Sequence, residues 1–584
     1  MLLANIHSLI PYAKMKILIT SALPYINGVK HLGNLAGSIL PADVIARFYR
    51  QIGHEVLFIC ATDEHGTPAE IAAAKEGLPV SEYCERQHKI QSSIYKKFYI
   101  SFDEFGRSSS FENHELTQHF YNALNQQGLI EERSIEQLFS IDDQRYLPDR
   151  YVVGTCPYCG YENARGDQCE NCTRVLDPTD LLDPRSEVSG STNIELKTTK
   201  HLYLKQSELV DSISDWIDRN SHWPTLVKST ARKWLNEGLK DRGITRDLSW
   251  GVPVNQPGFE NKVFYVWFDA PIAYISTTKA WAKNSNVSND KWKQWWYDAK
   301  DVKYLQFLAK DNIPFHTISF PATLIGSNEP WKLVDELKGF NWLNYYGSKF
   351  STSQNRGIFT DDAIKELPAD YWRYWLIANS PEGSDATFTF RLFAEQCNKD
   401  LSNNLGNFIN RSLKFCENNF GNTVPAGGTP GPLEQALAEN LEQFIADYRG
   451  NLEKLEFRKA TSALRAIWTE GNVYLTSAEP WKEIHHDVKR TECIVRTSLN
   501  LCKIIGILSW PIIPWTAERI LDGFGVEGNT PPWCSYNFKE TLFENSPSRE
   551  FKSVSQLFKK IDDARIDEFE RKYGVPAELQ KTEA

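Results

Sequence analysis

The sequence predicts an α/β protein with a Rossmann-like, doubly wound parallel sheet that is split by an insertion and followed by an α-helical bundle. An apolar run at residues 16–23, an amphipathic helical pattern at 35–49 and the buried-strand pattern VLFICA at 56–61 give strand, helix and strand. Strand-like runs return at 262–275 and 302–320, after short strands and turns that start near residue 134. Helical patterns fill the chain beyond residue 393, which is typical of a bundle.

The first strand run is stopped by Pro24, and the segment His31-Leu32-Gly33-Asn34 opens the first long helix. A helix N-terminus offers free N–H groups and a partial positive charge, which suits a polyphosphate. Gly33 has no Cβ and lets a flat base approach closely, while His31 can donate a hydrogen bond to phosphate oxygens. A helix cap with a surface histidine is the alternative for these residues alone. No GxGxxG follows the strand, so no dinucleotide cofactor is indicated.

Two CxxC pairs lie inside the stretch of short strands. Cys156 and Cys159 form one pair, Cys169 and Cys172 form the other, and nine residues separate them. Two such turns complete the tetrahedron that Zn²⁺ prefers, whereas two disulfides or four unrelated buried cysteines fit this spacing poorly. Four thiolates leave no open position, so we expect one structural zinc ion per chain in a zinc-binding insertion. His201 has no ligand spacing and is interpreted as an ordinary histidine.

The composition narrows the class of protein. The chain has 584 residues with 41% hydrophobic and 24% charged residues, as in ordinary globular proteins. Its net charge of −10 argues against a general nucleic-acid coater, although a local basic face can still bind RNA. No apolar run of about 18 residues predicts a membrane span. Eleven cysteines without a secretion signal predict a reducing compartment, and we expect the cytoplasm.

Three segments occur in the order and context of one family: SALPYINGVKHLGN at 21–34, FYVWFDAPIAY at 264–274 and AKDNIPFH at 309–316. On these segments the chain resembles the class I methionyl-tRNA synthetases, from about residue 16 to about residue 533. The resemblance implies that the protein activates L-methionine with ATP and Mg²⁺, and then transfers it to the 3′ end of tRNA(Met). It also implies that the chemistry needs no protein nucleophile, because positioning and charge stabilisation do most of the work.

The two ATP motifs of the family both depart from their consensus here. Asn34 replaces the last histidine of HIGH, and Thr352 replaces the second lysine of KMSKS, which reads Lys349-Phe350-Ser351-Thr352-Ser353. The loss of a charged hydrogen bond costs roughly 1.5–3 kcal/mol, so we hypothesise that Arg356 supplies the missing charge. A solvated Ser/Thr-rich loop is the alternative for this segment alone. The resemblance implies catalytic roles for His31, Asn34, Lys349 and Thr352, and ATP binding by these four with Gly33 and Asp311.

The resemblance also implies a methionine pocket. Asp63 matches the family carboxylate near the substrate ammonium, and Arg246 matches the arginine that orders the charged end. Aromatic and apolar walls suit a flexible thioether, and homocysteine is the expected difficult mimic. Core packing is the alternative for Trp267 and Tyr274, and a turn cap is the alternative for Asp63. Asn312 stands where many bacterial members have isoleucine. The implied walls are Ala22, Leu23, Tyr25, Trp267, Ala270, Pro271, Tyr274 and His316.

In the helical part, Asn407 and Arg411 match family positions that meet the tRNA anticodon, and Trp481 matches a tryptophan that stacks on an anticodon base. Stacking and edge hydrogen bonds are the usual way to read unpaired bases. A half-buried tryptophan at a helix end is the alternative for Trp481. An appended tRNA-binding or dimerising domain is not evident, so we expect a monomer.

The leucyl, isoleucyl and valyl synthetases are the nearest rival families, but their editing domain makes them much longer. A tRNA-binding relative with lost or weak amino-acid activation is the other alternative, because Asn34 and Thr352 both reduce the charge that faces the phosphates.

We expect a frayed extension upstream of the true start at 1–14, the first half of the catalytic domain at 15–133, the connective insertion at 134–230, the second half at 231–330, the KMSKS-type loop and linker at 331–392, the anticodon-binding domain at 393–545 and a tail at 546–584.

Overall fold

The computed structural model describes residues 14–575 except 170, 173, 175, 286, 289, 353–355, 527, 529, 534–536, 547–548 and 553. Most of the expected N-terminal extension, Ser353 of the second motif and the end of the expected tail therefore lie outside the described residues. Among the helices that are described, none is long and apolar enough to cross a membrane.

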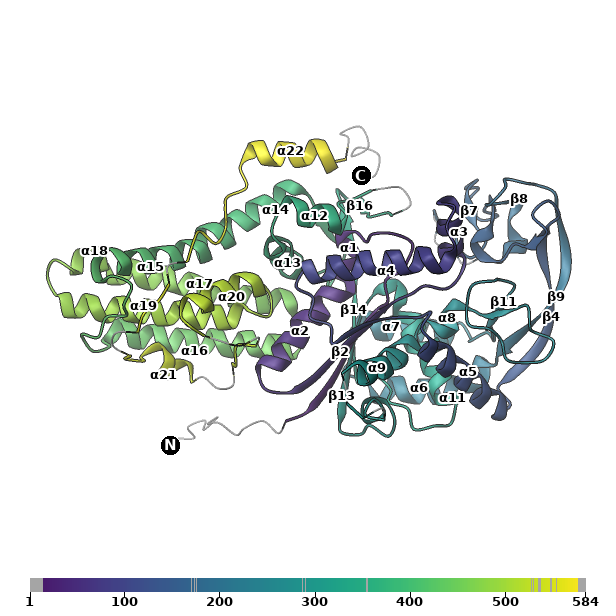
Figure 1. Ribbon diagram of the computed structural model, residues 1–584, viewed down its shortest axis with the longest axis horizontal. Coiled ribbons are helices and arrows are strands. Elements are labelled where there is room, and N and C mark those ends of the chain that lie inside the picture. Colours follow the sequence, from purple (N-terminus) through teal and green to yellow (C-terminus); the bar gives the residue numbers. More distant parts are fainter. Residues whose placement is uncertain are drawn as a thin grey trace.

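A five-stranded parallel sheet forms the centre of the molecule (Figure 1). β1 is its middle strand and pairs with β2 on one side and β13 on the other, which confirms the predicted α/β fold. Ile17 and Ile19 pack into one apolar cluster and Leu18 into another, because successive side chains of a strand point to opposite faces. In spatial order the strands are β14 (Glu336–Phe340), β13 (Val302–Ala309), β1 (Lys16–Ser21), β2 (Glu55–Thr62) and β3 (Glu104–Arg107).

Helices cover both faces of this sheet, as predicted for a doubly wound domain. The cluster on the Ile17 face includes side chains of α2 and α4 and continues into the C-terminal helices. The cluster on the Leu18 face includes side chains of α5, α6, α9 and α11. The α-helices up to residue 326 are α1 (Leu32–Asn34), α2 (Leu40–Gln51), α3 (Thr67–Lys75), α4 (Val80–Lys97), α5 (Phe111–Gln126), α6 (Val210–Arg219), α7 (Thr225–Asn236), α8 (Val266–Asp269), α9 (Ala273–Asn284), α10 (Lys293–Trp296) and α11 (Phe320–Gly326), and a π-helical turn at Leu35–Ile39 joins α1 to α2.

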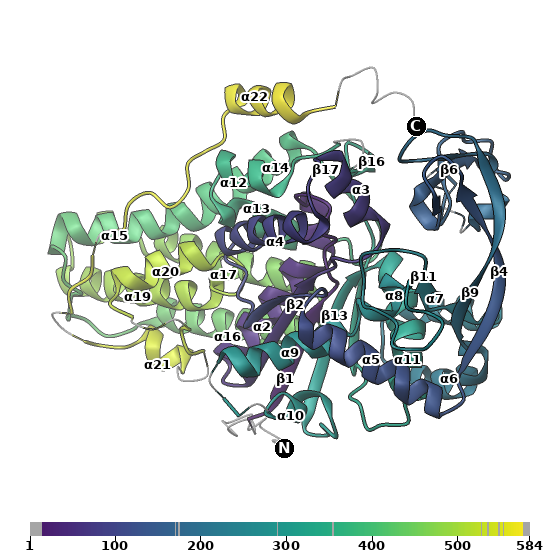
Figure 2. The same ribbon diagram turned by 45° about the vertical axis from the view of Figure 1, so that its right-hand side comes forward.

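The insertion is built on two small antiparallel sheets. Two strands of eleven residues each, β4 (Ile130–Ser140) and β9 (Ile194–Leu204), pair along their whole length. Figure 2 shows these strands at the edge of the molecule, beyond the central sheet. The chain returns to the α/β domain through β10 (Arg242–Gly243), which pairs with β9. The other strands are β5 (Arg145–Tyr146), β6 (Val152–Thr155), β7 (Ala164–Arg165), β8 (Leu182–Ser186), β11 (Thr245–Arg246) and β12 (Val263–Phe264).

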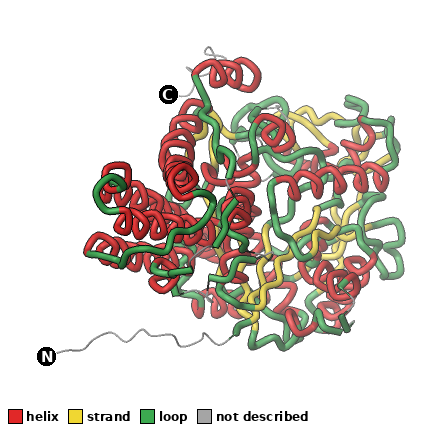
Figure 3. Tube along the Cα trace, turned by 60° about the vertical axis from the view of Figure 1, so that its left-hand side comes forward, coloured by secondary structure: helices red, strands yellow, loops and turns green. Residues whose placement is uncertain are grey.

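The C-terminal part is the predicted helical bundle, which Figure 3 shows to one side of the strand-bearing part. A small sheet and two helices lead into it: β15 (Leu343–Tyr345), β16 (Ser348–Lys349), β17 (Ala386–Phe388), α12 (Thr360–Glu366) and α13 (Ala369–Ala378). The bundle itself comprises α14 (Phe390–Cys397), a π-helical segment at Asn398–Gly406, α15 (Asn407–Phe420), α16 (Pro432–Glu453), α17 (Phe457–Ala478), α18 (Pro480–Glu483), α19 (Val488–Ser509), α20 (Pro514–Gly523) and α21 (Phe538–Leu542).

A buried polar node joins the bundle to the α/β domain. Asp43 of α2 accepts from Arg373 of α13 at 2.7 Å and from Arg47 at 3.0 Å, and all three side chains are buried. Arg373 also donates to the carbonyls of Pro511 and Ile512, at 3.0 and 2.9 Å, in the turn between α19 and α20. The bundle is thus hydrogen-bonded to the α/β domain through a buried cluster of charges, in which two arginines share the Asp43 carboxylate.

The last helix, α22 (Asp563–Tyr573), returns to the α/β side of the molecule (Figure 1). Its end accepts two hydrogen bonds from the β15–β16 hairpin: the Tyr345 hydroxyl donates to the Tyr573 carbonyl at 2.6 Å, and the Tyr346 hydroxyl to Glu570 at 2.5 Å. Arg565 pairs with Glu366 of α12 at 2.7 Å. This helix therefore contacts the chain both before and after the second ATP motif.

Candidate active site

The first motif forms the start of a long helical run. His31 is the N-cap: its Nδ1 accepts from the N–H of Asn34 at 3.3 Å, and Asn34 Oδ1 accepts from the N–H of His31 at 3.3 Å. An acceptor Nδ1 leaves the proton of the neutral ring on Nε2. Burial and the charge of Lys30 lower the pKa of His31 to about 3, so the ring is neutral at pH 7. His31 is therefore a neutral donor with a fixed tautomer.

The structure brings the two ATP motifs into contact. The His31 ring stacks on Phe350 of the KFSTS segment, with centroids 4.8 Å apart. A Cβ on Gly33 would lie 3.2 Å from the Phe350 ring and 3.1 Å from His31, so glycine permits this close approach. Behind the motifs, Leu32 N–H donates to the carbonyl of Ile358 at 3.3 Å. Residues far apart in the sequence thus form one surface.

The charged residues of the second motif lie away from His31. Lys349 is exposed, and its ammonium lies 3.8 Å from the centre of the Trp342 ring. Thr352 is exposed as well. Arg356 pairs its backbone with Ser351, and its guanidinium donates to the carbonyl of Tyr345 at 3.4 Å. Neither cation contacts His31 in the described part of the chain.

Asp63 follows β2 and is held by its backbone. Its N–H donates to the Pro24 carbonyl and its carbonyl accepts from Ile26, both at 2.9 Å. The side chain is buried, and its Oδ1 has no hydrogen-bond partner among the described residues. Burial, then the charges of Asp269 and Glu64, raise the pKa of Asp63 well above its usual value. Such a carboxyl favours a cationic ligand, which would supply the missing partner.

Tyr274 and His316 are joined in the buried wall beside it. His316 Nδ1 donates to the Asn312 carbonyl at 2.8 Å, so its Nε2 accepts from the Tyr274 hydroxyl at 2.9 Å. Burial lowers the pKa of His316 to about 4, and this ring too is neutral. The backbone of Leu23 also hydrogen-bonds the Tyr274 hydroxyl. Ala22 and Tyr274 belong to the same apolar cluster, with Leu23 packed against it.

The outer wall is aromatic and only half-buried. Trp267 of α8 lies against Phe315, with ring centroids 4.6 Å apart. Ala270 and Pro271 connect α8 to α9, and Pro271 is buried. Tyr25 is 46% exposed, and its backbone pairs with that of Asp63. Asp311 is exposed as well.

Arg246 has its own partners. Its Nε donates to Asp149 at 3.1 Å, and its guanidinium lies 3.6 Å from the centre of the Tyr265 ring. Further hydrogen bonds go to the carbonyls of Gly243 and Thr245. Within the described residues no hydrogen bond or ion pair joins Arg246 to Asp63. The structure thus connects Arg246 to the turn that precedes the cysteine knuckle.

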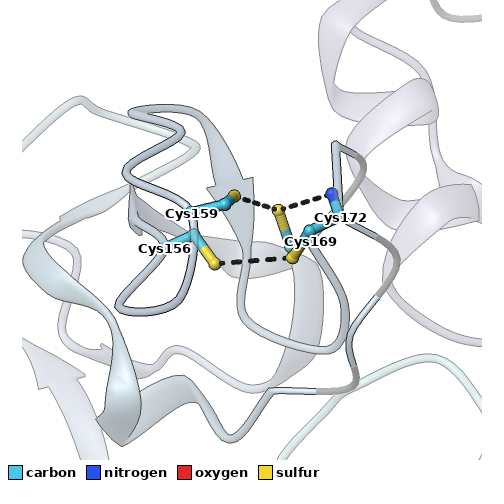
Figure 4. A group of neighbouring side chains, drawn as sticks. All are labelled: Cys156, Cys159, Cys169 and Cys172. Atoms are coloured by element: carbon cyan, nitrogen blue, oxygen red, sulfur yellow. Dashed lines mark hydrogen bonds between the residues drawn. The ribbon is translucent and has the colours of Figure 1, made fainter.

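The four cysteines of the insertion meet at one point (Figure 4). Their sulfurs all lie within 4.8 Å of one another, with Cys156 and Cys172 at 3.9 Å and Cys159 and Cys169 at 3.6 Å. Tetrahedral zinc with bonds of about 2.3 Å requires sulfurs about 3.8 Å apart, so this set fits the ion. His201 lies elsewhere and interacts with Asp247 at 3.0 Å. The cluster could bind a metal ion through all four cysteines.

A polar cleft of about 600 Å³ lies in the bundle. Asn407 and Arg411 of α15 line it, and Asn407 donates to Asn472 of α17 at 3.1 Å. The Arg411 guanidinium lies 5.1 Å from the centre of the Trp481 ring, which is 38% exposed. The three residues predicted for one RNA loop are thus neighbours. The cleft is lined by Lys399, Asp400, Asn403, Asn404, Asn407, Arg411, Arg465, Thr469, Asn472 and Thr476.

Comparisons with known proteins give the same family for the N-terminal and the C-terminal part of the chain. The family described as "tRNA synthetases class I (M)" matches residues 17–413, and "Anticodon binding domain of methionyl tRNA ligase" matches 424–578. The chain belongs to the class I methionyl-tRNA synthetase family. Methionine–tRNA ligase 1 of Acaryochloris marina is 55% identical over 96% of this chain and 100% of its own length. Methionine–tRNA ligase of Caulobacter vibrioides is 56% identical over 96% and 99%.

A solved structure of this family has the same fold. Mycobacterium tuberculosis methionyl-tRNA synthetase bound by methionyl-adenylate aligns with a TM-score of 0.76 at 22% identity, over 93% of this chain and all of that one. The predicted resemblance to methionyl-tRNA synthetases is therefore confirmed. The comparisons favour this family over the synthetases with an editing domain, and favour a ligase over a relative that has lost activation.

Two residues of this methionyl-tRNA synthetase site were missed from the sequence. Phe315 stands in AKDNIPFH directly before His316, but a phenylalanine there is indistinguishable from core. Arg242 lies over Trp267, with its guanidinium carbon 4.2 Å from the ring centre. An arginine beside a glycine in a loop-like stretch carried no signal, because the contact forms only when the insertion folds against the pocket.

Proposed function

We propose that this protein is a methionine–tRNA ligase that forms methionyl-adenylate from L-methionine and ATP and then charges the 3′ end of tRNA(Met). The observation that carries the proposal is the buried Asp63 carboxyl, which lacks a partner on Oδ1 beside the neutral Tyr274–His316 pair. A buried carboxylate with an open acceptor suits the α-ammonium of an amino acid. The apolar and aromatic walls around it suit a thioether, whose sulfur packs favourably against rings.

Activation requires ATP at the first motif. At this helix start the N–H groups of Leu32 and Asn34 are engaged by Ile358 and His31, so the donor is the Nε2–H of the neutral His31 ring, which donates to charge that develops in the transition state. Gly33 admits the flat base. Mg²⁺ bound to the triphosphate would neutralise part of its charge, and the exposed carboxylate of Asp311 is of the oxygen-donor type that would hold this ion.

The departures from the family consensus have separate explanations. Asn34 donates a neutral hydrogen bond, and its side chain closes the helix cap with His31. Lys349 leaves Trp342 and binds the phosphates when ATP enters, and Arg356 replaces the charge absent at Thr352. Arg356→Ala should slow adenylate formation about 10- to 150-fold if its hydrogen bond is charge-assisted. An unchanged single-turnover rate would exclude this role.

Arg246 helps to order the substrate's charged end by holding Tyr265 and Asp149 in place. Tyr25, Trp267, Ala270 and Pro271 form the remaining walls with Ala22 and Leu23.

The bundle reads the anticodon. Arg411 and Asn407 carry donors for base edges or phosphates, and the exposed face of Trp481 offers a stacking surface for an unpaired base. The insertion holds one structural Zn²⁺ on Cys156, Cys159, Cys169 and Cys172, which leaves no open position for substrate. Cys159→Ser should abolish stoichiometric zinc in the purified protein and loosen the insertion, as measured by metal analysis and limited proteolysis.

We further propose that the enzyme is a cytoplasmic monomer. All ten described cysteines are free thiols, in keeping with a reducing compartment. Methionine-dependent exchange of pyrophosphate into ATP is the decisive assay for the ligase. Exchange with leucine in place of methionine would reject the substrate. A protein that binds tRNA fully but supports no exchange would be the inactive relative.

A further inference from the structure

One arginine touches the aromatic pocket wall, and in the described residues its guanidinium forms no ion pair. Arg242 lies on β10, which joins the insertion sheet by pairing with Leu204 and Tyr203 of β9. Its guanidinium carbon is 4.2 Å from the centre of the Trp267 ring and 5.8 Å from that of Phe315. The two rings come from α8 and from the helical turn after β13, and they touch each other at 4.6 Å. A single side chain therefore bridges the insertion and both halves of the outer wall.

The neighbouring arginine, Arg246, has hydrogen-bond partners that the Arg242 guanidinium does not have among the described residues. Arg246, on the next short strand, has a carboxylate and two carbonyls as partners. In the described residues the Arg242 guanidinium makes no hydrogen bond or ion pair, although the residue is partly buried. Burial lowers the pKa of Arg242, and the charge of Asp149 acts in the opposite direction without forming an ion pair. The faces of the two aromatic rings further offset the cost of partial desolvation through the ring quadrupole. The rings are thus the feature that keeps this guanidinium in place.

Both rings that Arg242 contacts are close in the chain to residues of the proposed methionine pocket. Phe315 immediately precedes His316, and His316 accepts a hydrogen bond from the Tyr274 hydroxyl in the buried wall. Trp267 precedes Ala270 by three residues and Pro271 by four, which is about one helical turn. A change in the tilt of either ring therefore changes the space beside the proposed thioether site.

We propose that Arg242 is a positioning residue for amino-acid selection: its guanidinium clamps Trp267 against Phe315 and holds the aromatic wall in the shape that accepts methionine. This inference rests on the proposed ligase function. It assigns to the insertion a part in substrate choice, because β10 carries the clamp. A planar guanidinium stacks on two tilted rings better than an ammonium does, so lysine should substitute only in part.

The test compares three full-length variants with the wild-type enzyme. Arg242→Gln removes the charge, and Arg242→Lys keeps the charge without the plane. Arg133→Gln is the control for a general disturbance of this sheet, because Arg133 of β4 stacks on Tyr203 at 4.8 Å and pairs with Asp241, next to Arg242, without a described contact to Trp267 or Phe315. Methionine-dependent pyrophosphate exchange gives the KM for methionine, the KM for ATP and kcat. The ratio of kcat/KM for methionine to that for homocysteine gives the selectivity.

Arg242→Gln should raise the methionine KM about 3- to 30-fold and lower the selectivity, with less than a twofold change in the ATP KM, and Arg242→Lys should lie between it and wild type. Arg133→Gln should match wild type in all three constants. In a Trp267→Leu background, the additional effect of Arg242→Gln on methionine KM should vanish, because the ring that the guanidinium clamps is gone.

Three results would overturn the clamp in an enzyme that performs the exchange: a methionine KM of Arg242→Gln within twofold of wild type, an equal change in Arg133→Gln, or full additivity with Trp267→Leu. A wild-type protein without methionine-dependent exchange would instead overturn the ligase function, and the inference would fall with it. A drop in melting temperature shared by Arg242→Gln and Arg242→Lys, with unchanged constants, would assign Arg242 a purely structural role and also overturn the clamp.

Discussion

Asp43 and Asp63 are both buried carboxylates of the α/β domain, yet they differ in every partner. Asp43 accepts from Arg373, Arg47 and Ser101, and these partners hold its pKa below the usual value although burial alone would raise it. Asp63 has an open acceptor on Oδ1, and its pKa is raised by burial and by two neighbouring carboxylates. The paired carboxylate joins two domains, whereas the unpaired one is available to a ligand.

The largest effect expected from this comparison is the loss of the interdomain node. Asp43→Asn removes the carboxylate that both buried guanidinium groups contact and leaves them only Asp370, with which neither forms a described ion pair, so the free energy of unfolding should fall by about 3–5 kcal/mol. Denaturant unfolding measures this, and the methionine KM of the folded enzyme should stay within twofold. A variant as stable as wild type would show that the node is not needed to hold the bundle.

The corresponding substitution at Asp63 should weaken methionine binding and leave stability intact. Asp63→Asn removes a charge-assisted hydrogen bond to the substrate, so the methionine KM should rise about 10- to 150-fold. Stability should be equal or higher, because an incompletely paired buried carboxyl is itself costly. Pyrophosphate exchange and thermal unfolding check both parts. Loss of stability without loss of methionine affinity would make Asp63 a structural residue.

A change in pH should act on protein stability through Asp43 and on methionine binding through Asp63. The folded pKa of Asp43 lies below the unfolded one, so its contribution to stability is present above about pH 4 and is lost as the pH falls through the folded value. The raised pKa of Asp63 means that methionine binding releases a proton. Methionine affinity should therefore increase with pH, by at most tenfold per unit, until the pH passes that pKa. A profile of methionine KM against pH that is as steep in Asp63→Asn as in wild type would contradict this.

The smallest effect concerns Lys30, whose charge acts on Asp63. Lys30 is buried, donates to Asn27 at 3.1 Å, and lowers the pKa of Asp63 against the effect of burial. Lys30→Met should shift the pH profile of methionine KM upward by up to about one unit. Lys365→Met, on the exposed face of α12, is the control and should leave the profile unchanged. A downward shift in Lys30→Met would reverse the assigned sign.

The local features were predictable because they depend on short stretches of sequence. The strand at 16–21 follows from its apolar run, the helix after His31 from its periodicity, and the sulfur cluster from two CxxC turns. The family followed from segments such as SALPYINGVKHLGN, which combine a pocket wall with a helix start. The return of α22 to the β15–β16 hairpin could not be foreseen, because its contacts are hydrogen bonds between residues more than two hundred positions apart.

The sequence by itself therefore determined the fold class, the family and the clustering of the four cysteines, since periodicity, motif order and close spacing are properties of neighbouring residues. The tertiary structure alone decided which charges are paired. It gave Asp43 two arginines and left Asp63 with an open acceptor, engaged Arg246 with Asp149, and placed Arg242 on two aromatic rings. The physical reason is that burial and counter-charges come from segments that meet only in the folded chain, and they set the pKa and the ligand preference of each side chain.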